Sequence, residues 1–267
     1  MNNTFGFIGT GNMGGALAVA AAKGMDGKDI FLANKTHAKA EALAQKLGCG
    51  AVTVRQVAES CGFIFLGVKP QMMEDLLNTI APVLEARQDG FVLVSMAAGL
   101  SILDIRRMAG ADYPVIRIMP NTPVSVGEGV VLYDTADVPE AALAVFLENM
   151  RFAGLLDRLP EKLIDAGSAV AGCGPAFACM FAEALADGGV ACGLPRAKAM
   201  EYAAQMLLGT AALMLRSGEH PGKLKDAVCS PGGATIAGVR ALENGAFRAS
   251  AMNAVEAAYL RTKELGK

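Results

Sequence analysis

The sequence predicts an α/β fold in which an N-terminal Rossmann-type, doubly wound sheet is followed by an all-helical dimerisation domain. Three observations lead to this prediction. Short apolar runs alternate with longer amphipathic segments through the first 160 residues, a glycine-rich turn directly follows the first apolar run, and the apolar runs cease after Pro160. Such alternation is typical of a parallel sheet with helices on both faces. We therefore expect two domains, residues 1–160 and residues 161–267.

The predicted strands are short runs rich in Val, Ile, Leu and Phe, as expected for strands that are buried on both faces. Seven runs fit this description: Phe5–Ile8, Ile30–Asn34, Phe63–Val68, Phe91–Met96, Val115–Ile118, Gly129–Tyr133 and Leu155–Leu159. Together they predict a nucleotide-binding sheet.

The second half is predicted to consist of helices, because glycine and proline punctuate it at regular points. These points are Gly172–Pro175, Gly193–Pro195, His220–Gly222 and Pro231–Gly233. The segment Tyr202–Leu215 is apolar on nearly every face. A helix of that kind in a domain of about a hundred residues is expected to be buried against another subunit. The sequence therefore predicts an interlocked homodimer.

The composition favours a cytoplasmic protein that acts on a small molecule. A length of 267 residues with 53% hydrophobic residues can bury a large core, while a net charge of -2 argues against binding to nucleic acid or an anionic membrane. The N-terminus lacks a secretion pattern, and the charge-free apolar stretch Ala169–Ala182 is shorter than a membrane span. Six scattered cysteines without CxxC pairs predict free thiols and no metal site.

A dinucleotide fingerprint follows the first predicted strand and opens an alanine-rich segment, in the stretch Gly9-Thr10-Gly11-Asn12-Met13-Gly14. In this motif Gly9 permits the tight turn, Gly11 lets the backbone approach a pyrophosphate, and Gly14 lets the helix and strand pack closely. The helix N-terminus faces the negative charge.

The cofactor preference is predicted from the end of the second strand. Sites selective for NAD place an acidic residue there, whereas this chain has Asn34-Lys35-Thr36. Without a carboxylate to repel it, a 2′-phosphate could bind Lys35 and the Thr36 hydroxyl. We therefore expect NADPH, with NADH possible; the alternative is that Lys35 is only a solvated turn residue.

Two further strand ends are candidates for the ribose and nicotinamide half of the cofactor. Val68-Lys69-Pro70 ends one strand, and Lys69 is the only charged residue between Phe63 and Met73. Lys69 could instead terminate a strand with Pro70 beginning a helix. Ala97 and Ala98 follow the next strand and are small enough for a ring to lie against the backbone, although small residues are also ordinary packing.

The clearest signal in the helical half is Ser230-Pro231-Gly232-Gly233-Ala234-Thr235. We expect Ser230 at the N-cap, Pro231 at the first helical position, and both glycines just inside the helix. Such a start can hold a carboxylate, with the Thr235 hydroxyl one turn into the helix beside it. The alternatives are simple capping and a threonine that bonds its own backbone.

The usual acid–base residues are missing from recognisable patterns. No Ser/His/Asp set, HExxH motif or paired carboxylates occur, which argues against hydrolysis. Hydride transfer needs chiefly that a cofactor and an electrophilic acceptor are held in register.

Five stretches carry a more specific signal when they are taken together. They are Phe7–Gly14, Val68–Pro70, Arg117–Pro123 (RIMPNTP), Gly172–Ala176 (GCGPA) and Ser230–Thr235, the last within Pro221–Glu243 (PGKLKDAVCSPGGATIAGVRALE). This set resembles the pyrroline-5-carboxylate reductase family over essentially the whole chain. The resemblance implies NADPH-dependent reduction of 1-pyrroline-5-carboxylate to L-proline, in homodimers that are often gathered into a decamer of five dimers.

The resemblance also implies site residues. The pyrophosphate would lie against Ile8, Gly9, Thr10, Gly11, Asn12 and Met13, and the adenosine ribose beside Asn34 and Lys35. Val68, Lys69, Pro70, Ala97 and Ala98 would approach the nicotinamide half, and Glu161 would reach the cofactor. The substrate would be held by Ser230, Gly232, Gly233, Ala234 and the catalytic Thr235, with a second subunit helping to enclose it. Val54 and Ala227 depart from the polar residues that relatives place there.

Two other functions fit parts of the sequence pattern. A dehydrogenase of 3-hydroxy acids or 6-phosphogluconate would need a catalytic lysine on a central helix, for which Lys198 is the nearest candidate, outside a GxxxK context. A non-catalytic NADP(H) sensor would not need the Gly232–Thr235 cluster.

Overall fold

The computed structural model describes residues 1–265, which divide into two compact units. Unit 1 is Met1–Cys173 together with the segment from Ala258 onward, and unit 2 is Gly174–Ala257. The predicted boundary after Pro160 lies within unit 1, because helix α7 (Glu161–Ala171) belongs to that unit.

Unit 1 contains one eight-stranded sheet with the strand order β3-β2-β1-β4-β5-β6-β7-β8. The order from β3 to β6 is that of the Rossmann fold, so the predicted fold class is confirmed. The strands are β1 (Phe5–Ile8), β2 (Ile30–Ala33), β3 (Gly50–Ala51), β4 (Phe63–Leu66), β5 (Val92–Ser95), β6 (Val115–Pro120), β7 (Gly129–Ala136) and β8 (Gly154–Arg158).

All seven predicted strands are present, and the sheet differs from the expectation in two respects. The additional strand β3 has two residues, too few to give an apolar pattern. The expected parallel arrangement is wrong for one pair, because β7 runs antiparallel to β6. The connection between them holds only the short 3-10 helix η3 (Thr122–Val126). A parallel pair would need a crossover of about a dozen residues or more.

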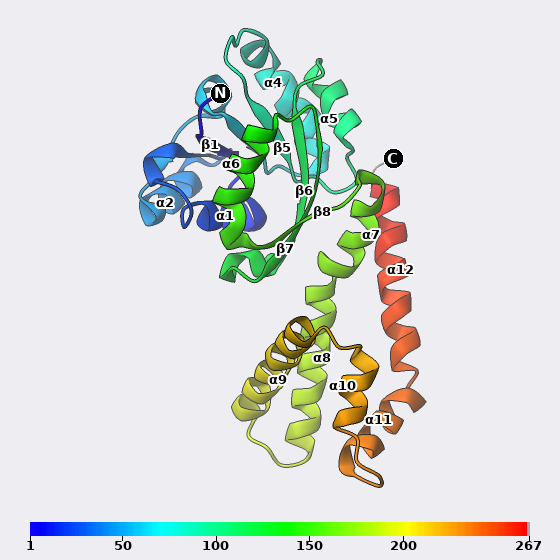
Figure 1. The fold of residues 1–267 in the computed structure, drawn as a ribbon. Helices are drawn as coiled ribbons and strands as arrows, with labels where there is room; N and C mark the ends of the chain where they lie inside the picture. Colours follow the sequence, from blue (N-terminus) through cyan, green and yellow to red (C-terminus); the bar gives the residue numbers. More distant parts are fainter. Residues whose placement is uncertain (266–267) are drawn as a thin grey trace. The chain divides into compact units, whose positions relative to one another are not determined.

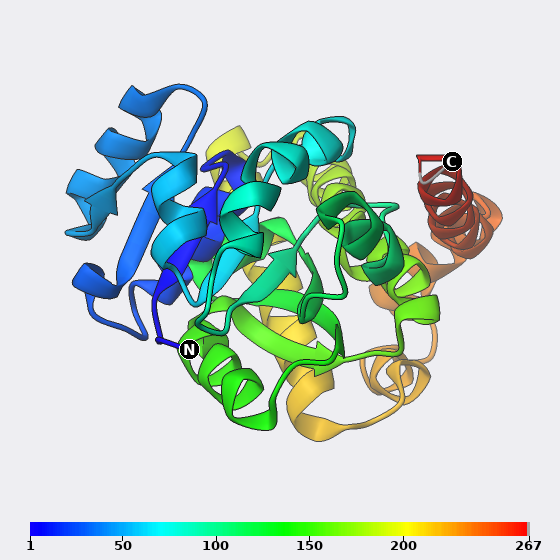
Figure 2. The same cartoon turned by 90° about the horizontal axis from the view of Figure 1, so that it is seen from above.

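Helices cover both faces of this sheet (Figures 1 and 2). One buried cluster joins the sheet to α1, α2 and α6, and a second joins the opposite face to α3, α4 and α5. The first contains a group of phenylalanines in which the rings of Phe7 and Phe65 stack at 4.2 Å between centroids. The helices are α1 (Asn12–Ala21), α2 (His37–Leu47), α3 (Val54–Ser60), α4 (Met73–Glu85), α5 (Ile102–Ala109) and α6 (Glu140–Met150).

Unit 2 consists of helices and lacks a hydrophobic core of its own. Its helices are α8 (Gly174–Ala191), α9 (Arg196–Ser217), α10 (Pro221–Ala227), α11 (Ala234–Asn244) and the first part of α12 (Phe247–Leu265). Within the described residues of unit 2, the buried hydrophobic side chains are three alanines, Ala186, Ala199 and Ala203. Large apolar side chains are exposed instead, including Leu215 at 86% and Met180 at 69%.

A unit of this kind cannot be stable alone, because alanines bury little apolar area and the hydrophobic effect scales with that area. The helical stretch Glu161–Ala191 is long and apolar enough to cross a membrane by length and composition, and only 11% of its apolar window is buried within the chain. The same exposure is expected of a helix that another subunit covers.

Candidate functional site

A cleft of about 590 Å³ opens in unit 1 at the carboxyl ends of β1, β2 and β4. The strand order reverses between β1 and β4, and ligands of open α/β sheets bind at this switch point. Seven predicted cofactor residues line the cleft, and the side of α4 that faces it adds residues that the sequence did not suggest. The lining is Ile8, Gly9, Gly11, Asn34, Lys35, Val54, Gly67, Val68, Lys69, Met72, Asp75, Leu76 and Thr79.

The glycines of the fingerprint have three different structural roles. Gly9 has a φ of +98°, and a Cβ there would collide with the backbone carbonyl of Gly67. A Cβ on Gly14 would collide with the carbonyl of Gly9, so Gly14 allows α1 to pack closely on the turn. A Cβ on Gly11 would meet no described atom within 4 Å. Gly11 therefore leaves open the space through which a ligand can approach the backbone.

The N-terminus of α1 is suited to an anion. Gly11 is its N-cap, and among the described residues no side chain caps the helix and no acidic residue lies in its first turn. The first amides thus retain their hydrogen-bonding capacity and the positive end of the helix dipole. The Thr10 hydroxyl is buried beside this turn and has no partner within residues 1–265. A pyrophosphate would satisfy these donors.

The end of β2 is electropositive. Lys35 is exposed at the cleft and forms no ion pair with a described residue, while its backbone N–H donates to the Asn34 side chain at 3.1 Å. Thr36 is the N-cap of α2 but makes no side-chain cap within the described chain. Lysine, a free hydroxyl and a helix N-terminus therefore occur together where a 2′-phosphate would lie.

The remaining predicted cofactor residues are not part of the cleft lining. Thr10, Asn12 and Met13 lie in or directly after the fingerprint turn, and Pro70 begins the 3-10 helix η2 (Pro70–Met72) with Lys69 as its N-cap. Ala97 is buried against the second core cluster, and Ala98 packs on a small cluster around Met119. Both alanines follow β5, as predicted.

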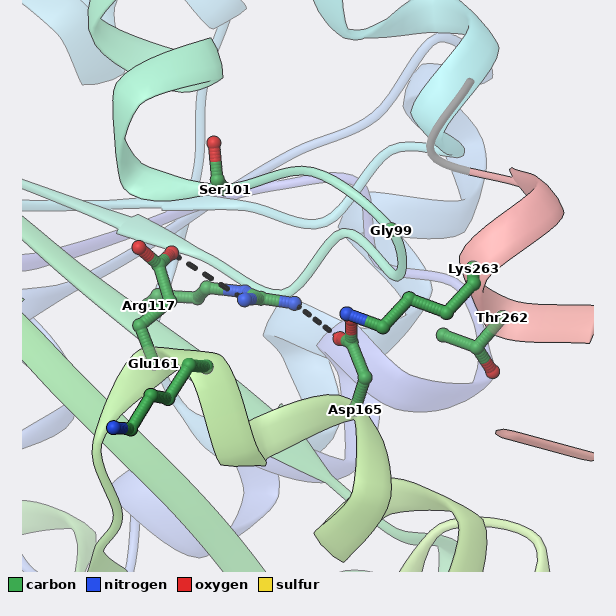
Figure 3. Close-up of a pocket in the computed structure, with 8 residues that line it drawn as sticks. Gly99, Ser101, Arg117, Glu161, Asp165, Thr262 and Lys263 are labelled. Atoms are coloured by element: carbon green, nitrogen blue, oxygen red, sulfur yellow. Dashed lines mark hydrogen bonds and ion pairs between the residues drawn. The ribbon is translucent and has the colours of Figure 1, made fainter. Parts of the chain in front are cut away.

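Glu161 lies in a separate polar cavity of unit 1, with a volume of about 350 Å³ (Figure 3). Its carboxylate accepts a hydrogen bond from the Ile102 backbone N–H at 2.7 Å and pairs with Arg117 at 3.3 Å. Arg117 also donates to Asp165 at 2.7 Å, and Lys263 lies 3.3 Å from Asp165. Glu161 does not line the cleft, and its contact with the cofactor stays a prediction.

Sequence reasoning missed this charged cluster, although two signals were present. Arg117 is the only charge in the apolar run Val115–Ile118, and it is 3% exposed. Glu161 and Asp165 are four residues apart, which places both on one face of a helix. The sequence therefore contained a buried arginine and, on one helix face, two carboxylates that could pair with it.

The predicted start of the substrate helix requires a correction. Helix α11 begins at Ala234 with Gly233 as its N-cap, so Pro231 and the glycines precede the helix rather than lying inside it. Gly232 has a φ of +69°, which is incompatible with a right-handed helix. Thr235 is consequently the second helical residue and is exposed.

This start retains the property on which the prediction depended. Within residues 1–265, no side chain caps α11 and its first turn carries no acidic residue. The glycine turn before the helix leaves the first amides unobstructed, so the start of α11 can bind a carboxylate.

The cysteines do not form a reactive group. All six are free within the described chain, and burial raises the pKa of the Cys61 thiol to about 11. Hydrogen bonds from Ser60 and Thr4 reduce that effect only in part, so Cys61 stays neutral and inert. In residues 1–265 no group of three or more His, Cys, Asp or Glu side chains could hold a metal ion.

Comparison with known proteins identifies the family. Residues 161–265 match the pyrroline-5-carboxylate reductase dimerisation model, and residues 4–99 match the model described as NADP oxidoreductase, coenzyme F420-dependent. Pyrroline-5-carboxylate reductase 2 of Bos taurus is 40% identical over 97% of this chain and 83% of its own length. The chain belongs to the pyrroline-5-carboxylate reductase family. The reductase of Pisum sativum is 37% identical over 98% of this chain and 96% of its own.

Solved structures of the family agree with this assignment. The pyrroline carboxylate reductase of Plasmodium falciparum, with NADP bound, has a TM-score of 0.88 and 31% identity, covering 99% of this chain and 98% of its own. The pyrroline-5-carboxylate reductase of Coxiella burnetii has a TM-score of 0.89 and 30% identity, with 100% of both chains covered. Membership of this family excludes the alternative of a 3-hydroxyacid or 6-phosphogluconate dehydrogenase. The candidate catalytic lysine for that alternative, Lys198, is exposed and pairs with Glu201 at 2.8 Å.

The glycine roles predict different outcomes for two alanine substitutions. Gly11→Ala should leave the melting temperature of the cofactor-free protein unchanged but raise the Kd for NADPH about tenfold or more, because its Cβ occupies the space that the ligand needs. Gly14→Ala should lower the melting temperature, because its Cβ collides with the Gly9 carbonyl. Thermal unfolding and NADPH fluorescence titration measure both effects. Normal NADPH binding by Gly11→Ala would contradict the assignment of the cleft.

Proposed function

We propose that this chain reduces 1-pyrroline-5-carboxylate to L-proline with NADPH, the last step of proline biosynthesis. The observation that carries this proposal is the match to reductases of that name along nearly the whole chain, including both the nucleotide-binding part and the dimerisation region. The reaction adds a hydride to the imine carbon and a proton to the ring nitrogen. The chain therefore has to hold a dinucleotide and a small anionic imine.

The cleft of unit 1 fits a dinucleotide. The open space at Gly11, the uncapped start of α1 and the unpartnered Thr10 hydroxyl all favour a bound pyrophosphate. Ile8, Gly9, Val68 and Lys69 would form the walls around it. When bound, NADPH supplies the hydride for the reduction.

Lys35 is proposed to select NADPH over NADH. A lysine at the end of β2, beside the uncapped start of α2, can bind a 2′-phosphate through its charge and the helix amides. Asn34 and the Thr36 hydroxyl would add neutral hydrogen bonds that either cofactor can use.

Lys35→Glu should therefore change the cofactor preference. The new carboxylate would repel the 2′-phosphate, so kcat/KM for NADPH should fall about tenfold or more, equivalent to about 1.4 kcal/mol. The value for NADH should change by less than about threefold, since NADH lacks that phosphate. Lys46→Glu, at the other end of α2, is the charge-matched control and should keep the NADPH preference. An equal loss with both cofactors would contradict the role of Lys35.

The start of α11 is proposed to bind the substrate. Its free amides and the preceding turn, with Ser230, Gly232, Gly233 and Ala234, would hold the carboxylate of the imine. The Thr235 hydroxyl would orient the ring nitrogen by a hydrogen bond. Thr235 is too weak an acid to protonate the imine strongly, so the proton would be present on the substrate or arrive through water. The predicted enclosure of this site by a second subunit stays a prediction.

NADPH oxidation with 1-pyrroline-5-carboxylate tests the reaction and the role of Thr235 together. The unmodified protein should oxidise NADPH and form proline, and well-folded protein without this activity would refute the proposed reaction. Thr235→Val should lower kcat/KM about tenfold, because it removes the hydroxyl at nearly constant volume. Thr235→Ser keeps a hydroxyl and should retain most of the activity. Full activity in Thr235→Val would show that Thr235 does not orient the substrate.

The chain forms a homo-oligomer, because the dimerisation region of its family spans residues 161–265 and includes all of unit 2. We propose that the exposed apolar side chains of unit 2 are buried between two copies. Further assembly into a decamer of five dimers and a cytoplasmic location stay predictions.

Sedimentation analysis tests the assembly. A dimer of 27.5 kDa chains should be the smallest species in which unit 2 is folded, and dilution should unfold unit 2. Met180→Glu, which places a charge on an exposed apolar position of α8, should weaken the assembly. A stable monomer in which unit 2 stays folded would contradict the inference that unit 2 needs a partner.

A further inference from the structure

The segment Ala97–Ser101 connects β5 to α5 at the carboxyl end of the sheet. It is irregular, and Gly99 has a φ of +77°. Ala97 and Ala98, which follow β5, are predicted to approach the nicotinamide half of the cofactor in the proposed function. The position of this segment therefore decides how well the ring is held.

Two carboxylates hold the end of this segment at the start of α5. Asp104 belongs to the same helix and forms a capping box with Ser101. Burial alone would raise the pKa of Asp104, but hydrogen bonds from Ser101, with the charges of Arg107 and Arg117, outweigh burial and lower it. Glu161 is 59 residues away in the sequence and accepts the Ile102 backbone N–H at 2.7 Å. The capping box of Ser101 and Asp104 defines the residue at which α5 begins. The Glu161 carboxylate defines the position of that residue within unit 1.

Glu161 is itself held from two sides. Its backbone N–H donates to Asp134 of β7 at 2.7 Å, which ties the start of α7 to the sheet. Its carboxylate pairs with Arg117, whose guanidinium lies between Glu161 and Asp165 in Figure 3. Arg117 is buried on β6.

The register of the sheet places Arg117 beside the start of the segment Ala97–Ser101. Arg117 lies opposite Ser95, the last residue of β5, and only Met96 separates Ser95 from the start of the segment. Because α5 begins directly after the segment, one rigid group contacts the chain at both of its ends. A shift of Glu161 would be passed to Ile102 and from there to Ala97–Ser101.

We propose that Glu161, oriented by Arg117, is a positioning residue for the segment Ala97–Ser101 and through it for the nicotinamide end of the bound cofactor. In this role Glu161 acts through the Ile102 N–H and needs no contact of its own with the cofactor. This inference rests on the proposed function for the placement of the nicotinamide ring. Its effect should accordingly be confined to that half of the cofactor.

Three variants of Glu161 and two ligands test this proposal. Glu161→Ala removes the acceptor, and Glu161→Asp keeps the charge at the start of α7 but draws the carboxylate back by one methylene. Both should bind NADPH about fivefold more weakly and lower kcat about tenfold. Both should bind 2′,5′-ADP, which lacks the nicotinamide half, with a Kd within twofold of the unmodified protein. Glu161→Gln retains an oxygen that can accept the Ile102 N–H and should restore most of the binding.

Glu140→Ala is the matched control. Glu140 is the first residue of α6 and follows Pro139, as Glu161 follows Pro160 in α7, but it is exposed. It should change neither ligand's affinity. The proposal is overturned if both ligands weaken equally in the Glu161 variants, if neither weakens, or if Glu140→Ala reproduces the effect. The binding comparison needs no turnover, so failure of the proposed reaction would appear separately, as inactivity of the unmodified protein.

Discussion

The cofactor cleft depends on the close approach of two backbones at the centre of the sheet. The Gly67 N–H donates to the Ile8 carbonyl at 2.7 Å, and the Gly9 N–H donates to the Ala33 carbonyl at 2.8 Å. A Cβ on Gly9 or on Gly67 would collide with the other backbone. Because both strands turn away at this contact, the chain can enter α1 without a side chain standing in front of the helix amides. The strand order reverses at the same point, so the crevice and the anion-binding helix start coincide.

The helical unit follows a different constraint, which is the absence of an internal core among its described residues. Helices such as α9 satisfy their backbone hydrogen bonds internally, but their apolar side chains gain nothing until another surface covers them. Folding and association are then one process, and the apparent stability of the unit depends on the concentration of the chain. The stretch Glu161–Ala191 is long and apolar enough to cross a membrane. It lies within the family's dimerisation region, and burial against another subunit explains its exposed apolar side chains.

The sequence was sufficient for the sheet because the strands of a doubly wound fold are buried on both faces and so have continuous apolar runs. It was insufficient where the outcome depends on connections or on distant contacts. The two residues of β3 give no pattern, and the direction of β7 follows from the length of the link after β6. The start of α11 was misplaced because its pattern of Ser, Pro and Gly does not reveal the left-handed backbone of Gly232. The role of Glu161 depends on Ile102, a partner that no local motif indicates.

The charged cluster around Arg117 serves to orient side chains more than to raise the free energy of unfolding. A buried ion pair gains little over well-packed apolar residues, because desolvation offsets the attraction between the charges. In this cluster the Nε of Arg117 also has no partner within residues 1–265, which is a further cost. The N–H donors of a guanidinium lie in one plane and point in fixed directions. Those of Arg117 therefore orient Glu161 on one side and Asp165 on the other. A carboxylate fixed in this way holds the Ile102 N–H in one place, whereas apolar packing would leave that donor without an acceptor.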